Sequence, residues 1–304
     1  MREFRPIATP TRTVEIMRRF DIQMKKSLGQ NFLIEPRMLE KMIEAGQVDA
    51  DTTVIEIGPG IGALTQYLAH HAKQVLAFEI DQRFVGILQE TLADCDNVQV
   101  VHQDILSVDF SSPEYAWLHD QSRLVVVANL PYYITTPIIM TLLEKRVPVT
   151  DMTLMMQEEV ARRMQAAPGN KDYGALSLAV QYYSVPYIAA FVPQNCFMPR
   201  PNVGSAVVNL KCHEKPPVEV MDEELMFKLI KASFAQRRKT LQNGLANSAE
   251  LDFTKEEITE AILKMQEILG MKQNPLIRGE TLTLKEFACL SDVFSKNKRN
   301  KGSI

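Results

Sequence analysis

Cysteines are few in this sequence, and none stand in a metal-binding spacing. The four cysteines form no C-x-x-C pair, which argues against a zinc site and against a disulfide framework; they are Cys95, Cys196, Cys212 and Cys289. Long apolar runs are also absent, since no stretch approaches the roughly 18 to 20 apolar residues that span a bilayer. Arginines interrupt the N-terminal stretch where a secretory signal would have its apolar core. We therefore expect a protein of the reducing cytoplasm, with no membrane partner and no metal.

A basic excess is missing as well. The formal net charge is -3, whereas proteins that coat nucleic acids usually carry more cations than anions. Any contact with RNA must therefore use a local cluster of cations, and the run Arg237, Arg238 and Lys239 is a candidate.

The pattern of apolar residues predicts an α/β fold followed by a helical region. Between residue 53 and about residue 210, short β-branched runs alternate with amphipathic stretches, which is typical of a mostly parallel, twisted sheet flanked by helices. The expected strands are 53–57, 74–79, 98–102, 123–128, 152–157 and 206–211, and the expected helices between them are 64–71, 82–92 and 137–145.

Beyond the pair Pro216-Pro217 the pattern changes to helices alone. Four stretches have a 3.6-residue period, and Thr254 followed by Glu257 predicts a capping box at the start of one of them. These helices are expected at 222–235, 239–246, 254–269 and 284–294. The predicted organisation is an N-terminal extension (1–24) without an assigned role, an α/β domain (25–213) and a small all-α domain (214–304).

A glycine-rich turn follows the first strand. Residues 56–62 read Glu-Ile-Gly-Pro-Gly-Ile-Gly and precede a helical stretch, so backbone without Cβ atoms can approach a ligand at the carboxyl edge of the sheet. A nucleoside-type ligand is implied. Ala63 stands where a strict G-x-G-x-x-G would have its third glycine, and a dinucleotide site remains open at this point.

Acidic residues end the next two strands. Glu79 lies 21 residues after Gly58, where a carboxylate accepts hydrogen bonds from both hydroxyls of a ribose. Asp104 is suited to accept from the exocyclic amine of an adenine, beside the apolar Ile105 that can cover the ring. These acids fit NAD as well as other adenosine cofactors.

The fourth strand ends in Asn129-Leu130-Pro131-Tyr132, and this turn favours methyl transfer. The N6 amino group of adenine is a poor nucleophile, because its lone pair is delocalised into the ring. We expect the Asn129 side-chain oxygen and the Leu130 carbonyl to accept both N6 hydrogens and bias the nitrogen toward tetrahedral geometry. Pro131 stiffens the turn and Tyr132 stacks on the base.

With these motifs the chain resembles the bacterial small-subunit ribosomal RNA adenine dimethyltransferases of the KsgA type, over essentially its whole length. The resemblance also rests on residues 26–33 (Lys-Ser-Leu-Gly-Gln-Asn-Phe-Leu), 197–205 (Phe-Met-Pro-Arg-Pro-Asn-Val-Gly-Ser) and 234–241 (Phe-Ala-Gln-Arg-Arg-Lys-Thr-Leu). It implies a Rossmann-like class I methyltransferase domain that uses S-adenosylmethionine, with the C-terminal helices contacting RNA.

The resemblance also implies roles for individual residues. Phe197 would complete an aromatic clamp with Tyr132, so that Asn129, Leu130, Tyr132 and Phe197 are the expected catalytic residues. The expected cofactor contacts are Gln30, Asn31, Leu33, Gly58, Gly60, Glu79, Ile80, Asp104, Ile105 and Asn129. The expected RNA contacts are Arg237, Arg238, Lys239 and Arg278, although Arg278 and Glu280 could instead pair with each other.

The implied substrate is a hairpin loop near the 3′ end of 16S rRNA in an immature 30S subunit, where two adjacent adenosines each receive two methyl groups. An unpaired base is expected because a base inside a duplex cannot enter such a clamp. A monomer without affinity for DNA is the working assumption.

Four alternatives stay open. One is the related antibiotic-resistance class that modifies large-subunit RNA, and another is a DNA adenine methyltransferase, for which we find no separate target-recognition domain. A binding module that has lost the reaction would differ by lacking competent residues, yet every required position holds one. A dehydrogenase is disfavoured because no His or Tyr-Lys pair is placed for hydride chemistry.

Overall fold

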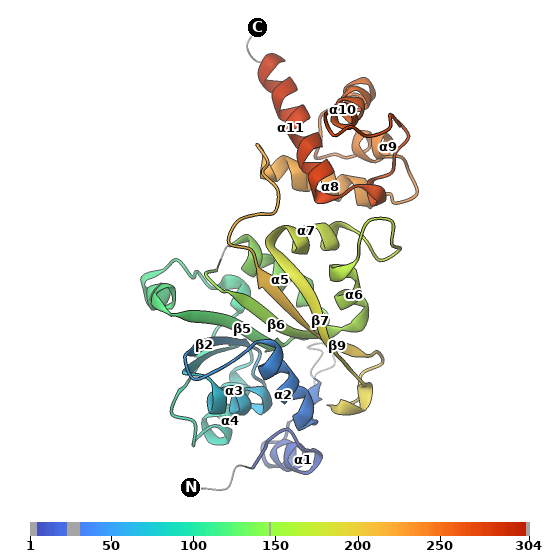
Figure 1. The fold of residues 1–304 in the computed structure, drawn as a ribbon. Helices are drawn as coiled ribbons and strands as arrows, with labels where there is room; N and C mark the ends of the chain where they lie inside the picture. Colours follow the sequence, from blue (N-terminus) through green and yellow to red (C-terminus); the bar gives the residue numbers. More distant parts are fainter. Residues whose placement is uncertain (1–4, 23–30, 146, 302–304) are drawn as a thin grey trace. The chain divides into compact units, whose positions relative to one another are not determined.

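The computed structural model describes residues 5–22, 31–145 and 147–301, and these form two compact units. The first unit comprises residues up to 161 together with 185–212, and the second comprises 162–184 together with the residues from 213 onward. Figure 1 shows the helices and strands in chain order.

A seven-stranded sheet forms the centre of the first unit, in the order β4-β3-β2-β5-β6-β9-β7. Strands β4, β3, β2, β5 and β6 run parallel, and β9 pairs antiparallel with β6. Their bounds are β2 (Thr52–Ile57), β3 (Gln74–Glu79), β4 (Val98–His102), β5 (Arg123–Asn129), β6 (Asp151–Gln157), β7 (Ser184–Val192) and β9 (Ser205–Cys212). The mostly parallel sheet is confirmed, and each expected strand lies within one residue of its predicted bounds. Strand β7 is an addition to the prediction.

Helices cover both faces of this sheet (Figure 1). Helices α2, α3 and α4 lie on one face, over a core that includes Leu39, Leu68 and Leu88, and α5 lies on the other face. The bounds are α2 (Pro36–Ala45), α3 (Ala63–His71), α4 (Gln82–Thr91) and α5 (Thr135–Glu144). Strands β2, β5 and β6 are buried along almost their whole length and are rich in apolar residues, whereas the edge strand β4 is only partly buried.

The N-terminal extension packs against the first unit. Helix α1 (Pro10–Arg19) begins after Thr9, whose side chain accepts from the Arg12 amide, and Ile16 is buried in the same core as α2–α4. The side chain of Gln66 in α3 makes two hydrogen bonds to the segment before α1. Its Oε1 accepts from the Ile7 amide (2.9 Å), and its Nε2 donates to the Arg5 carbonyl (3.1 Å). Residues 5–22 are therefore part of this unit and form no separate arm.

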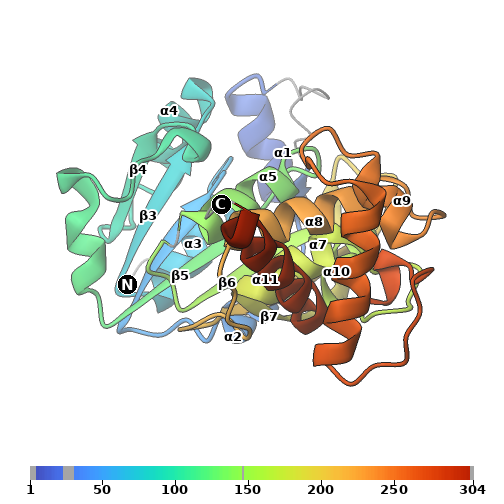
Figure 2. The ribbon, with the colours of Figure 1, turned by 90° about the horizontal axis from the view of Figure 1, so that it is seen from above.

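The described part of the second unit is built mainly of helices. They are α7 (Ala175–Tyr183), α8 (Glu223–Ala235), α9 (Leu241–Ala246), α10 (Lys255–Ile268) and α11 (Leu284–Lys301); Figure 2 shows α8–α11 gathered together. The predicted capping box is confirmed: the Thr254 hydroxyl accepts from the Glu257 amide (3.2 Å), and the Glu257 carboxylate accepts from the Thr254 amide (2.8 Å). Helix α11 extends seven residues beyond its predicted end at 294.

The division of the chain differs from the expected boundary at 213 in one respect. Residues 162–184, which we assigned to the α/β domain, belong with the C-terminal helices. The cause is their packing: the hydroxyls of Tyr182 and Tyr183 both donate to the carboxylate of Glu223 at the start of α8. Tyr173 is 1% exposed and donates to the Leu282 carbonyl (2.7 Å). Helix α6 (Glu158–Gln165) connects the two units along the chain.

A search of the described helices for a segment long and apolar enough to cross a membrane finds none.

Candidate active site

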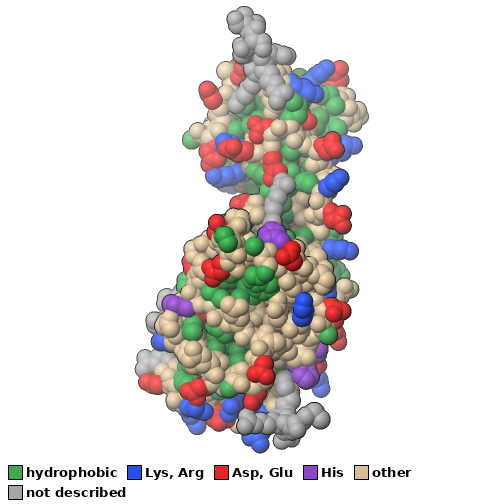
Figure 3. All heavy atoms as spheres, turned by 90° about the vertical axis from the view of Figure 1, so that its left-hand side faces the viewer, with side chains coloured by type: hydrophobic (Ala, Val, Ile, Leu, Met, Phe, Trp, Pro, Cys, Tyr) green, Lys and Arg blue, Asp and Glu red, His purple; other side chains and the backbone are tan. Residues whose placement is uncertain are grey.

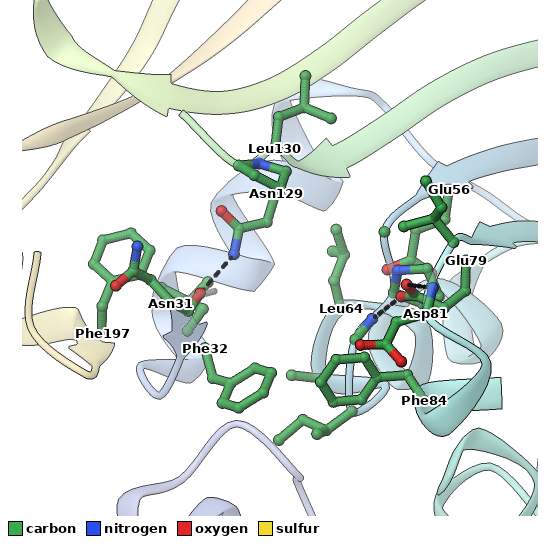
Figure 4. Close-up of a pocket in the computed structure, with 18 of the residues that line it drawn as sticks. Asn31, Phe32, Glu56, Leu64, Glu79, Asp81, Phe84, Asn129, Leu130 and Phe197 are labelled. Atoms are coloured by element: carbon green, nitrogen blue, oxygen red, sulfur yellow. Dashed lines mark hydrogen bonds between the residues drawn. The ribbon is translucent and has the colours of Figure 1, made fainter. Parts of the chain in front are cut away.

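A pocket lies in the first unit at the carboxyl ends of β2, β3 and β5 (Figure 4). Parallel strands bring their carboxyl ends to one edge of the sheet, so residues far apart in the sequence meet there. Ten of the expected site residues line this pocket: Asn31, Leu33, Gly58, Gly60, Glu79, Ile80, Asn129, Leu130, Tyr132 and Phe197.

The glycine turn and Glu79 are joined by a hydrogen bond. Gly60 has a left-handed backbone (φ +58°), and its amide donates to Oε2 of Glu79 (3.1 Å) while the Asp81 amide donates to Oε1 (2.8 Å). Burial raises the pKa of Glu79, and the two amides act in the opposite direction. A Cβ on residue 60 would lie 3.3 Å from the Phe32 ring, so glycine is needed there for space as well as for conformation. The carboxylate is thus fixed in place and keeps lone pairs for a ligand.

Glu56 is a third acidic group in the pocket, which we did not predict as a site residue. It is 1% exposed, and its Oε2 has no hydrogen-bond partner among the described residues. Burial, together with the nearby Glu79, raises its pKa to about 8. The Thr65 hydroxyl is close enough to lower that pKa somewhat, although it makes no hydrogen bond of normal geometry in the described structure. A carboxyl inside an otherwise apolar strand was the sequence signal that could have identified it.

The turn at residues 129–132, called here the Asn129 turn, lines the same pocket as the glycine turn. The Asn129 Nδ2 donates to the Asn31 carbonyl (3.4 Å), which leaves its side-chain oxygen available as an acceptor (Figure 4). The Leu130 amide donates to Met155 O of β6 (3.1 Å), and this fixes the backbone after the strand. The Tyr132 hydroxyl is bonded to Ser205 Oγ (2.6 Å) at the start of β9, and burial raises its pKa.

Phe197 reaches the pocket through a second, two-stranded sheet. Strand β1 (Phe32–Leu33) pairs antiparallel with β8 (Phe197–Met198), with Leu33 opposite Phe197. This pairing joins two of the sequence motifs, and it explains why Leu33 and Phe197, which are 164 positions apart, line one cavity. Phe197 is only 4% exposed and belongs to the core, so its ring is a wall of the pocket and is largely covered by neighbours.

Among the described residues, two expected cofactor contacts, Asp104 and Ile105, are not part of the pocket lining. Gln30 lies outside the described residues. Asp104 accepts a hydrogen bond from the Leu106 amide (3.0 Å), and Ile105 is 6% exposed. Both follow β4, whose last residue pairs with Glu79, so they lie at the same edge of the sheet as the pocket. The lining contains residues we did not predict, among them Phe84. Its ring packs edge-on against the Phe32 ring, with 6.0 Å between the ring centroids.

The expected RNA contacts belong to the second unit. Arg237, Arg238 and Lys239 are exposed, but they occupy a turn and not the start of a helix. Helix α9 begins later because the Thr240 side chain caps it by accepting from the Asn243 amide. Arg278 and Arg237 both lie near the Glu280 carboxylate, at 3.9 Å and 3.7 Å. On the face of the molecule seen in Figure 3, cationic and anionic side chains are interspersed, as the net charge suggests.

Within the described ranges, no group of three His, Cys, Asp or Glu side chains is placed to hold a metal ion. The pocket lining contains Glu79, whose carboxyl group is held by two backbone amides, together with Asp81, which is paired with Arg83, and Glu56, whose pKa is raised to about 8; among its described residues it contains no Lys or Arg. Such a lining suits a ligand that carries positive charge and offers hydrogen-bond donors.

Comparison with known proteins identifies relatives of the whole chain. Residues 22–277 match the family described as ribosomal RNA adenine dimethylase. The ribosomal RNA small subunit methyltransferase A of Lachnoclostridium phytofermentans is 53% identical over 291 residues, which are 95% of this chain and 98% of that protein.

Two solved structures are similar in fold. A dimethyladenosine transferase from Plasmodium falciparum superposes with a TM-score of 0.71 at 26% identity, covering 88% of this chain and 98% of that one. The 23S rRNA methyltransferase ErmE superposes with a TM-score of 0.60 at 25% identity, covering 87% and 99%.

Proposed function

Because the chain belongs to the ribosomal RNA adenine dimethylase family, we propose that it transfers methyl groups from S-adenosylmethionine to N6 of two adjacent adenosines in 16S rRNA. The products are N6,N6-dimethyladenosines in a hairpin loop near the 3′ end. The partner is an immature 30S subunit in the cytoplasm. The observation that carries the proposal is a single cavity that holds the glycine turn, Glu79 and the Asn129 turn.

The residues of the pocket fit this cofactor. Glu79 offers acceptor oxygens for the ribose hydroxyls, and the exposed Ile80 offers an apolar surface for the adenine ring. The unpartnered Glu56 Oε2 provides an acceptor for a further donor group. A lining with acidic side chains and no Lys or Arg suits the positively charged S-adenosylmethionine better than the anionic pyrophosphate of a dinucleotide, although Asp81 is paired with Arg83 and Glu56 has a raised pKa. When bound, the cofactor supplies an electrophilic methyl group on a sulfonium.

The Asn129 turn prepares the nucleophile. The Asn129 side-chain oxygen and the Leu130 carbonyl accept the two N6 hydrogens, so that the nitrogen becomes tetrahedral and its lone pair is localised on nitrogen and no longer delocalised into the ring. Tyr132, held by Ser205, stacks on one face of the adenine, and Phe197 limits the pocket on the other side. The contribution of these residues is positioning and electrostatics, and no strong base is required.

Modification of large-subunit RNA is the second candidate, because ErmE shares the fold. The small-subunit assignment is favoured by the 53% identity to a relative named for the small subunit, compared with 25% to ErmE.

Labelled methyl transfer to purified, unmethylated small subunits tests the function. We expect the label to appear as N6,N6-dimethyladenosine in 16S rRNA, with large subunits left unlabelled in a parallel reaction. Label in the large subunit alone would establish the second candidate. Binding to small subunits without transfer would identify a binding module.

Glu79→Gln is expected to weaken cofactor binding by about 10- to 100-fold, because hydrogen bonds to a charged group are lost and an amide NH₂ now competes with the Gly60 and Asp81 donors. Calorimetric titration with S-adenosylmethionine measures the change. Glu114→Gln is the matched control, since Glu114 is an exposed carboxylate of the same unit that does not line the pocket. Equal affinities of the two variants would contradict the role given to Glu79.

A further inference from the structure

Tyr132, in the Asn129 turn, and Tyr133, which follows it, differ in their surroundings. Tyr132 is bonded through its hydroxyl to Ser205. Its neighbour Tyr133 is 57% exposed, lines the same pocket, and has no hydrogen-bond partner for its hydroxyl among the described residues. Tyr133 is not among the site residues predicted from the sequence.

The position of Tyr133 is unusual among the exposed apolar side chains. Nine large hydrophobic residues are exposed in the described part of the chain, and only Ile80 and Tyr133 also line the pocket. Scattered exposed apolar residues need no explanation, but an exposed aromatic ring at the mouth of a binding cavity presents a flat surface to whatever enters. Ile80 follows Glu79, at the end of the pocket assigned to the cofactor.

The backbone holds Tyr133 at this position. The Pro131 carbonyl accepts from the Ile134 amide (3.2 Å) and from the Thr135 hydroxyl (3.0 Å). These two hydrogen bonds join the residue two positions before Tyr133 to the two residues after it, and so fix the turn that carries Tyr133. Helix α5 begins at Thr135, which is itself buried. The ring is therefore presented by a fixed turn, and binding would order little more than its own two side-chain torsions.

We propose that Tyr133 stacks on the nucleotide next to the target adenosine and holds it at the rim of the pocket. This inference rests on the proposed function. When one unpaired base enters the cavity, its neighbour in the strand stays outside, within reach of residues at the rim. Aromatic side chains bind unpaired bases by stacking. Because the two target adenosines are adjacent, Tyr133 would hold one of them while the other is modified.

The test compares Tyr133→Leu with Tyr133→Phe in steady-state methylation of unmethylated small subunits. Loss of a base-stacking contact raises KM for the particle by about 10- to 100-fold in the leucine variant, whereas phenylalanine keeps a near-native KM. Affinity for S-adenosylmethionine, measured without RNA, should be unchanged in both. Tyr187→Leu is the matched control, because Tyr187 is a tyrosine of the same unit with 61% exposure that does not line the pocket.

A fluorescent loop gives a second readout. A hairpin RNA with 2-aminopurine beside the target adenosine should be quenched on binding to the native chain and to Tyr133→Phe, and less so on binding to Tyr133→Leu. An unchanged KM in the leucine variant, equal losses in the leucine and phenylalanine variants, or weakened cofactor binding would each overturn the inference while leaving the proposed function in place. A native chain that transfers no methyl to small-subunit RNA would overturn both.

Discussion

Replacing Asn129 with alanine is expected to lower kcat for methyl transfer by roughly 10²- to 10³-fold, the usual effect of removing one preorganised polar contact at a reacting centre. The alanine variant loses the side-chain oxygen proposed to accept an N6 hydrogen, so the nitrogen stays planar and its lone pair stays delocalised into the ring. It also loses the Nδ2 donor that bonds the Asn31 carbonyl. Single-turnover transfer at saturating S-adenosylmethionine measures the step without contributions from cofactor affinity or product release.

Asn129→Asp provides the comparison. Aspartate keeps an acceptor oxygen, but it replaces the amide donor to Asn31 with a negatively charged carboxylate oxygen, so its activity should lie between those of alanine and the native chain. Cofactor affinity of both variants is measured separately by titration. An alanine variant within threefold of the native kcat would show that the Leu130 carbonyl suffices and would remove Asn129 from the mechanism.

Glu56→Gln is expected to change how stability depends on pH. The pKa of Glu56 is raised from 4.5 to about 8 in the folded chain, so between these values the folded state binds more protons than the unfolded state. The free energy of unfolding must then fall as pH rises through this window. Ionisation of Glu56 should lower the free energy of unfolding by roughly 3 to 4 kcal/mol between pH 5 and pH 8, at 1.36 kcal/mol for each unit of pKa difference.

A glutamine at position 56 does not titrate, so the variant should not show this decrease in the free energy of unfolding. Its stability relative to the native chain should therefore increase as pH rises. Urea unfolding of both proteins at several pH values between 5 and 8 measures the difference, and the comparison cancels groups that titrate in both. Glu114→Gln, which changes an exposed carboxylate, should follow the native curve. Parallel curves for the native chain and Glu56→Gln would show that the folded chain does not hold Glu56 protonated.

The parallel strands and the loops that follow them were predictable because their signals are local. A buried parallel strand is a short apolar run, and the residues that we propose to bind ligand stand at its carboxyl end: Glu79 and Asn129 are the last residues of β3 and β5, and Gly58 follows β2. Strand β7 was missed for the opposite reason. Val185, Tyr187 and Phe191 are exposed yet apolar, and Pro186 interrupts the run, so the segment shows no alternation of polar and apolar residues.

Tertiary packing decided what the sequence pattern could not. Residues 162–184 belong with the C-terminal helices because of side-chain contacts such as those between Tyr182, Tyr183 and Glu223, which leave no local signal. The burial of Glu56 likewise depends on helix α3 covering the strand. The N-terminal segment, to which we assigned no role, packs through Ile16 and Gln66, and only the structure shows these partners.

The sheet of the first unit is assembled from two separate stretches of chain. In the sequence, residues 162–184 of the second unit separate β2–β6 from β7 and β9. During synthesis, the glycine turn and Asn129 leave the ribosome long before these strands do. The edge of β6 that will pair with β9 stays open during that interval and can attract other strands. The pocket that we propose for the cofactor is complete only when Phe197 has emerged to pair beside Leu33, so stabilisation by a ligand in the complete pocket begins only then.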